Sequence, residues 1–317
     1  MSLAHNHHHH AHGDLTKKAA IASVSMALFL LALKIFAAAE TGSVALMGSL
    51  ADTAFDVLAS LLTLFSVRYA AMPADDDHRF GHGKAEALSA LLQVILVTVS
   101  AILIAWRAIV RFGDQAPTDH PEYGIGVSII AIITTLGLLA YQRYVVLKTG
   151  SVAIQADHVH YQSDLLLNIA VIIAILLDTM LNLRGADPLF GLAIAAWLLW
   201  GAYRAAGLAL DQLLDREWPQ EKRQRFIEVA LRHPELRGIH DMRTRSSGVH
   251  DFCQFHVWVD PNMTVEAAHQ IMDEVEQALM DEFPGVEVLI HPDPEGHKDK
   301  MGYLPSETIE HHDHPHD

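Results

Sequence analysis

Six long apolar stretches dominate the first two thirds of the chain. Each contains about 20 mostly apolar residues, the length that crosses a hydrocarbon core about 30 Å thick. The loops between them are short. The pattern therefore predicts an all-α membrane domain, a bundle of six transmembrane helices near residues 17–39, 43–70, 85–112, 122–147, 152–183 and 187–210.

The charges in the loops predict how this bundle is oriented. Basic residues gather on one side, at Lys17, Lys18, Arg68, Arg79, Lys84, Arg143, Lys148 and Arg216. The other side has Glu40, Asp114, Asp119 and Glu122, with Arg111 and Arg184 as its clear basic residues. Because loops rich in lysine and arginine remain in the cytoplasm, we expect both termini there.

After Leu214 the pattern changes to that of a small globular domain. Helical periodicity at 219–233 and 264–283 alternates with strand-like segments at 238–246, 251–259 and 286–291, and Thr264 is a suitable N-cap. The order αββαβ is typical of a two-layer α+β domain. We expect a His-rich N-terminal tail (1–14), a six-span transmembrane domain (15–212), a cytoplasmic domain (213–293) and a His-rich C-terminal tail (294–317).

Composition narrows the class of protein. The chain has 317 residues, 51% of them hydrophobic, a mean hydropathy of +0.20, a net charge of −16, 22 histidines and one cysteine, Cys253. The acidic balance argues against nucleic acid as a partner, and a single cysteine excludes an internal disulfide. The N-terminal histidine run is either an expression tag or a metal-collecting tail. Both tails are expected to be disordered.

Two pairs of polar residues lie inside the predicted spans. Asp52 and Asp56 are four residues apart in the second span, and His160 and Asp164 are four apart in the fifth, so each pair shares one helix face. Isolated polar groups in lipid are costly. Three carboxylates and one imidazole form a suitable tetrahedral site for a divalent ion such as zinc. We expect these four residues to form it.

Neighbouring polar residues receive different interpretations. Asp157 lies one turn before His160 and is expected to line the entrance to the site, whereas His158 points elsewhere and is expected to be an interfacial histidine. In the loop "ADDDHRFGHGKAE", Asp75, His78 and His82 have a spacing found in zinc sites and are a second candidate site.

The cytoplasmic domain carries a dispersed set of candidate ligands. They are His240, His256, His269, His291 and Asp293, and spacing alone does not bring them together. His233 and His250 are expected to be ordinary surface histidines.

Several motifs together resemble the cation diffusion facilitator family, specifically its bacterial ferrous-iron/zinc efflux branch. They are "GSLADTAFDVLASLLTLFSVRYA", "PADDDHRFGHGKAEALSAL", "QADHVHYQSD", "LLDREWP", "HDMRTRSSG", "QFHVWV" and "VLIHPDP". The resemblance covers about residues 15 to 293 and leaves out the tails.

The resemblance implies a homodimeric antiporter in the bacterial inner membrane that exports divalent metal and imports protons. It implies six spans and a ferredoxin-like, metallochaperone-like cytoplasmic domain. Asp52, Asp56, His160 and Asp164 match the family's transport site, and Asp75, His78 and His82 its loop site. His240, His256, His269, His291 and Asp293 match its binuclear site. Lys84 and Asp215 match a salt bridge that locks the dimer.

The sequence leaves the transported ion open among Zn²⁺, Fe²⁺, Cd²⁺ and Co²⁺, with the Asp-Asp/His-Asp set closest to zinc-type members. Two other functions use the same residues: a metal-gated cation channel, and a membrane-anchored metal sensor. An enzyme is not expected, because no nucleophile or base constellation appears outside the metal-binding groups.

Overall fold

The structure is a computed structural model that describes residues 3–41, 44–111, 121–181, 186–248, 250–297 and 310–311. The chain divides into two compact units, one spanning Ala11–Leu213 and one containing residues 3–10 together with the described residues from Leu214 onward. Each unit is described by itself.

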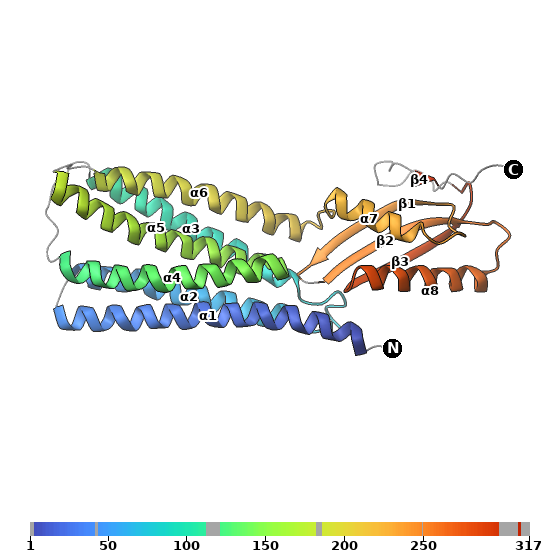
Figure 1. Ribbon diagram of the computed structural model, residues 1–317, viewed down its shortest axis with the longest axis horizontal. Coiled ribbons are helices and arrows are strands. Elements are labelled where there is room, and N and C mark those ends of the chain that lie inside the picture. Colours follow the sequence, from blue (N-terminus) through green and yellow to red (C-terminus); the bar gives the residue numbers. More distant parts are fainter. Residues whose placement is uncertain are drawn as a thin grey trace. The chain divides into compact units, whose positions relative to one another are not determined.

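The first unit is a bundle of long helices (Figure 1). They are α1 (Leu3–Thr41), α2 (Val44–Ala70), α3 (Lys84–Arg111), α4 (Pro121–Thr149), α5 (Val152–Leu181) and α6 (Ala186–Leu213). Their bounds agree with the apolar stretches of the sequence to within a few residues, except at the start of α1.

Five of these helices are long and apolar enough to cross a membrane, judged on the described residues: α1, α2, α3, α4 and α6. Long apolar side chains such as Phe65, Trp106 and Leu147 are exposed on their outer faces, as expected where lipid replaces water. The prediction of spanning helices is confirmed for these five. For α5 it stays a prediction.

Helix α1 starts earlier than expected. It begins at Leu3 and includes the histidine run, which corrects the prediction that the N-terminal tail is disordered. The run contains neither proline nor glycine, and the first glycine of the chain, Gly13, follows it. Because extending an existing helix is much easier than nucleating one, the long apolar segment that follows is sufficient to extend the helix through these residues.

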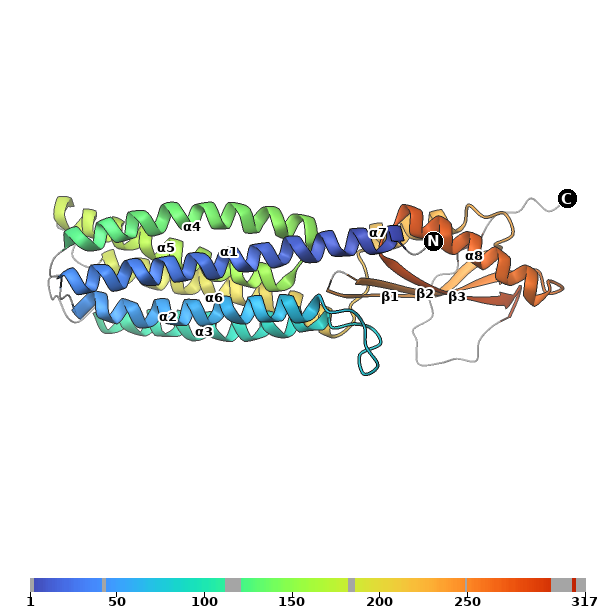
Figure 2. The ribbon, with the colours of Figure 1, turned by 90° about the horizontal axis from the view of Figure 1, so that it is seen from below.

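The second unit is a two-layer domain. Its elements are α7 (Gln220–Ala230), β1 (Gly238–Ser247), β2 (His250–Val259), α8 (Val265–Glu282), β3 (Val286–Pro294) and the two-residue β4 (Glu310–His311). Figure 2 shows α7 and α8 over the same face of the sheet. The expected order αββαβ is confirmed. The expected N-cap is also present, since the Thr264 side chain accepts a hydrogen bond from the Ala267 amide.

The sheet has the order β3-β2-β1-β4. Strands β1 and β2 are antiparallel and joined at Gly248, whose φ of 63° suits glycine. Strands β2 and β3 are parallel, as required when α8 crosses between them. Strand β4 is an addition, because residues 294–317 were expected to contain only a disordered tail. The ferredoxin-like topology stays a prediction.

Alternate residues of β2 separate the two faces of this sheet. Cys253, Phe255 and Val257 lie in the apolar core with residues of α7 and α8, such as Phe226 and Leu279. Since successive strand residues point to opposite faces, His256 lies on the face away from the helices.

The buried thiol of Cys253 gives a direct test of this core. Cys253 is 1% exposed, and burial raises the pKa of its thiol above the ordinary value. Because the thiolate is the reactive form, a thiol reagent at about pH 8 should leave the folded, detergent-solubilised chain unlabelled. After unfolding in guanidinium, one thiol per chain should react. Rapid labelling of the folded chain would contradict this packing.

Candidate metal sites

Three residues from two helices converge inside the membrane domain. Asp56 on α2 and His160 and Asp164 on α5 each offer a ligand atom, and these atoms lie within 4.8 Å of one another. His160 Nε2 is 3.2 Å from Asp56 Oδ1 and 3.8 Å from Asp164 Oδ2. That nitrogen is buried without a geometrically acceptable hydrogen bond among the described residues. A buried imidazole nitrogen facing two carboxylates is suitable for a cation.

Asp52, the fourth predicted ligand, lies in α2 one turn before Asp56, but its side chain is outside the described residues. The described part of the structure therefore brings together three of the four predicted transport-site residues. The i,i+4 spacing on one helix face applies to Asp52 and Asp56 as it does to His160 and Asp164.

Asp157 does not line an entrance, which corrects the expectation from sequence. Its side chain is fully buried, and its carboxylate accepts hydrogen bonds from Gln142 at 2.8 Å and Gln93 at 3.4 Å. Gln142 in turn donates to Ser23 at 3.0 Å. Asp157 thus links α1, α3, α4 and α5, because a buried carboxylate needs donors and these helices supply them.

The expectation that His158 is an interfacial histidine stays a prediction. This residue is half-buried, and its Nε2 lies 3.0 Å from the Gln162 amide one turn along α5. Among the described residues, His158 belongs to none of the groups of side chains that could bind a metal ion.

The loop between α2 and α3 brings together Asp75, His78 and His82, all three of the residues predicted there. The Asp75 carboxylate accepts hydrogen bonds from the backbone amides of His78 and Asp77. The hydrogen bond from the His78 amide is the main cause that lowers the pKa of this carboxyl. His82 Nε2 lies 3.3 Å from Asp75 Oδ2. The His82 ring is buried edge-on against Tyr69, so one ligand of this loop is anchored to α2.

The cytoplasmic sheet aligns three histidines in one row. The register pairs His240 of β1 with His256 of β2, and His256 with His291 of β3. Asp293, two residues after His291, lies on the same face. Its carboxylate is 2.8 Å from His256, 3.7 Å from His240 and 3.5 Å from His291. Four of the five predicted residues therefore lie together, as three histidines around the buried carboxylate of Asp293.

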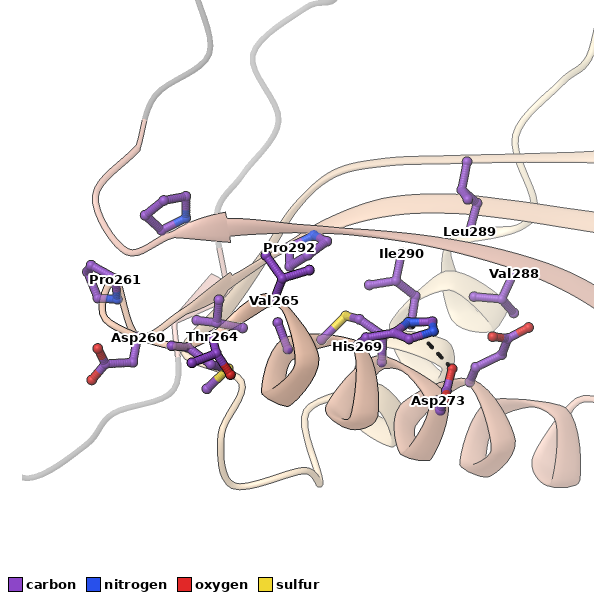
Figure 3. A pocket seen from close by; sticks show the side chains of 16 residues that line it. Asp260, Pro261, Thr264, Val265, His269, Asp273, Val288, Leu289, Ile290 and Pro292 are labelled. Atoms are coloured by element: carbon purple, nitrogen blue, oxygen red, sulfur yellow. Dashed lines mark ion pairs between the residues drawn. The ribbon is translucent and has the colours of Figure 1, made fainter.

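His269, the fifth, lies elsewhere. It is on α8, its side chain is 77% exposed, and its Nδ1 is 3.8 Å from Asp273 one turn along the helix. Figure 3 shows it facing a cavity of about 510 Å³ between α8 and β3. The described residues of one chain do not bring His269 into the histidine row.

The other predicted residues are placed as follows. Lys84 donates to the Leu213 carbonyl at 3.3 Å, and Asp215 lies 4.0 Å from Arg245. Lys84 and Asp215 belong to different units, so their salt bridge stays a prediction.

The two histidines expected at the surface lie outside the candidate metal sites. His233 lies 3.2 Å from Glu274. His250 is half-buried, and this burial lowers its pKa. Among the described residues, neither His233 nor His250 belongs to a group of side chains that could bind a metal ion.

Two residues near these sites were not singled out by their motifs. Asp241 groups with His240 and His256, and its φ of 50° lies at an irregularity in the β1–β2 pairing. Lys34 hydrogen-bonds to Thr53, next to the transport-site acids. Its signal in the sequence is a single charge within a long apolar run.

Comparison with known families agrees with this arrangement. The family described as the cation efflux transmembrane domain matches residues 20–214. The family described as the cation efflux protein, cytoplasmic domain, matches residues 218–295. The two matches correspond to the two units of the structure.

Named relatives cover nearly the same length. The cation-efflux pump FieF of Cronobacter sakazakii is 43% identical over 283 residues, which are 89% of this chain and 94% of the relative. FieF of Salmonella arizonae is 44% identical over the same shares. A solved structure of the zinc form of CzrB is 36% identical over 27% of this chain and 99% of its own, with a TM-score of 0.25.

The family matches extend over most of the chain, and the similar full-length relatives are transporters, which agrees with the expectation that the protein is not an enzyme. A bundle of apolar helices with an acidic, histidine-containing cluster inside it is a suitable framework for moving a cation. The chain belongs to the cation efflux family of membrane transporters.

Proposed function

We propose that the protein exports zinc-like divalent ions from the cytoplasm in exchange for protons. The observation that carries this proposal is the meeting of Asp56, His160 and Asp164 between two helices of the membrane domain. Acids and a histidine at such a depth are costly without a cation or protons to balance them. In a cation efflux protein, the transported ion is the natural partner of this cluster.

The ligand set supports a zinc-like substrate. With Asp52 as the proposed fourth ligand, the site offers three carboxylates and one imidazole. Zinc accepts both ligand types in tetrahedral sites, and imidazole also suits other transition-metal ions. We therefore propose Zn²⁺ as the main substrate, with Fe²⁺, Cd²⁺ and Co²⁺ as further candidates.

Proton exchange follows from the chemistry of the same ligands. An imidazole nitrogen binds metal only when it is unprotonated, and carboxylates bind metal in their ionised form. Protons and metal therefore compete for His160, Asp56 and Asp164. Protons that enter from the outside would displace the ion there, and the protonated site would lose protons again on the cytoplasmic side.

The proposed setting is a bacterial inner membrane. We propose that α5 is a sixth span, because it pairs with α2 to form the transport site, and that both termini are cytoplasmic, following the basic loops. The transmembrane domain is then 15–212, the cytoplasmic domain 213–293, and residues 1–14 and 294–317 are flanking segments rich in histidine. The Lys84–Asp215 salt bridge belongs to this proposal.

We also propose that the protein is a homodimer whose ferredoxin-like cytoplasmic domains associate through bound metal. Three aligned histidines around Asp293 support a metal site on the face of the sheet opposite α7 and α8. His269, on α8, is the remaining ligand proposed for a binuclear site. The loop group of Asp75, His78 and His82 is a further metal site, at the cytoplasmic end of the bundle.

The first prediction concerns the transport site. Asp164→Ala removes a charged ligand, so metal flux in proteoliposomes should fall to background while the protein remains folded. Asp14→Ala, which removes an exposed carboxylate of α1, is the matched control and should transport normally. His160→Asp keeps the number of ligands and should retain flux, with a preference shifted toward harder ions.

Simultaneous recording of metal and of internal pH separates the competing functions. Antiport predicts that an imposed pH gradient drives metal movement. Metal flux that ignores the gradient would favour a channel, and no flux with intact metal binding would favour a sensor. Wild-type exchange in Asp164→Ala would contradict the assignment of the site.

The second prediction concerns the cytoplasmic domain. It has its own apolar core, so residues 213–297 should fold alone. Zinc should promote dimerisation of this fragment in sedimentation experiments, and Asp293→Ala should remove the effect because Asp293 contacts all three aligned histidines. His233→Ala is the control, since His233 pairs with Glu274 outside the row. Association that is the same with and without zinc would contradict the role.

A further inference from the structure

A lysine lies inside the membrane domain, beside the transport site. Lys34 is part of α1, within the spanning segment Gly13–Ala39. Charged side chains are rare inside such segments, and they usually face a partner in the protein interior or a pathway for ions. The Lys34 ammonium donates a hydrogen bond of 2.5 Å to Thr53 Oγ1 on α2, and Thr53 is 2% exposed.

The position of Thr53 brings this ammonium close to the acidic cluster. Thr53 directly follows Asp52 and precedes Asp56 by three residues, which is about one helical turn. The Lys34 charge is also among those that act on the Asp164 carboxyl. Helix α1 therefore contributes a positive charge to a site whose proposed ligands come from α2 and α5.

The hydroxyl of Thr53 is neutral and cannot balance the charge of Lys34. Among the described residues, Lys34 acts on the carboxylate of Asp164, which belongs to the proposed transport site. With Asp52, Asp56 and Asp164 ionised, these acids carry three negative charges, and Lys34 reduces their net charge to minus two. That value is equal and opposite to the charge of one divalent ion.

Asp157 is left out of this count because it is not a proposed ligand, although its charge also acts on the Asp164 carboxyl. The Asp157 carboxylate is held by amide hydrogens of Gln142 and Gln93, and Tyr161, the other titratable side chain there, is bonded to Ser60 and the Ser23 carbonyl.

We propose that Lys34 is a specificity-determining residue that matches the charge of the transport site to one divalent ion. This inference rests on the proposed function of that site. A loaded site that contains Lys34 is neutral, and a neutral site is the least costly to expose to a low-dielectric membrane during transport. The lysine also weakens metal binding enough for release, because its positive charge repels the ion.

The main alternative is that Lys34 only ties α1 to α2 through Thr53. Two substitutions separate the effect of the Lys34 charge from the effect of its hydrogen bond to Thr53. Lys34→Gln removes the charge and keeps a donor for Thr53, whereas Thr53→Val removes the hydrogen bond and keeps the charge. Lys34→Arg keeps a charge in the same place. Lys34→Met provides a second neutral side chain, suited to an apolar span, if Lys34→Gln does not fold.

The test is the concentration dependence of Zn²⁺ transport by the full chain in proteoliposomes, after each variant has passed size-exclusion and thermal-unfolding controls. Lys34→Gln should lower the apparent KM for Zn²⁺ by at least about tenfold and also lower the maximal rate, because one repulsive charge is gone. Lys34→Arg should restore both parameters toward the wild-type values. Thr53→Val should keep KM within about threefold of wild type.

Three outcomes would overturn the inference. A wild-type KM in a folded neutral variant, Lys34→Gln or Lys34→Met, would show that the charge does not act on the ion. A change in Thr53→Val equal to that in Lys34→Gln would show a structural tie. Failure of both neutral variants to fold, with Lys34→Arg and Thr53→Val folded, would assign the charge to stability. Asp164→Ala, measured alongside, tests the proposed function separately, because its full activity would reject the site itself.

Discussion

The cost of placing charge in a low-dielectric interior is the constraint on which this structure depends. Every buried charge or polar group in the membrane domain needs a partner. Asp157 finds donors in Gln93 and Gln142, and these hydrogen bonds join four helices. Asp56, His160 and Asp164 instead face one another. The first set stabilises the bundle, whereas the charges of the second are offset only in part by Lys34, and this remainder supports the proposed cation site.

The cytoplasmic unit also brings buried polar side chains together with partners, but it does so on a β-sheet. An apolar core between the sheet and two helices fixes the register of three strands, and this register aligns His240, His256 and His291 across one face. Asp293 is buried among them. Because the strands are held by a core on the opposite face, the ligands can be positioned without metal. For the metal site proposed here, this rigidity removes the cost of ordering the side chains on binding.

The sequence predicted features that follow from local periodicity. The i,i+4 pairs, the H-x₃-H loop and the order αββαβ all depend on spacing along the chain, and α2, α5, β1, β2 and α8 were predicted nearly at their bounds. Features that depend on tertiary packing could not be predicted from the sequence. The row of histidines requires the strand register, Asp157 turns inward because neighbouring helices supply amides, and Lys34 meets Thr53 across two helices. The start of α1 at Leu3 was also missed, because the sequence pattern does not show how far a helix extends beyond its apolar segment.

The central claim is that Asp52, Asp56, His160 and Asp164 bind the transported ion together. It is tested most directly by an experimental structure of the full chain with Cd²⁺ or Zn²⁺, located by anomalous diffraction. The account predicts a peak between α2 and α5, about 2.0–2.2 Å from the carboxylates and the imidazole for zinc. An occupied loop group and an occupied histidine row, with no metal between α2 and α5 at saturating concentration, would contradict it.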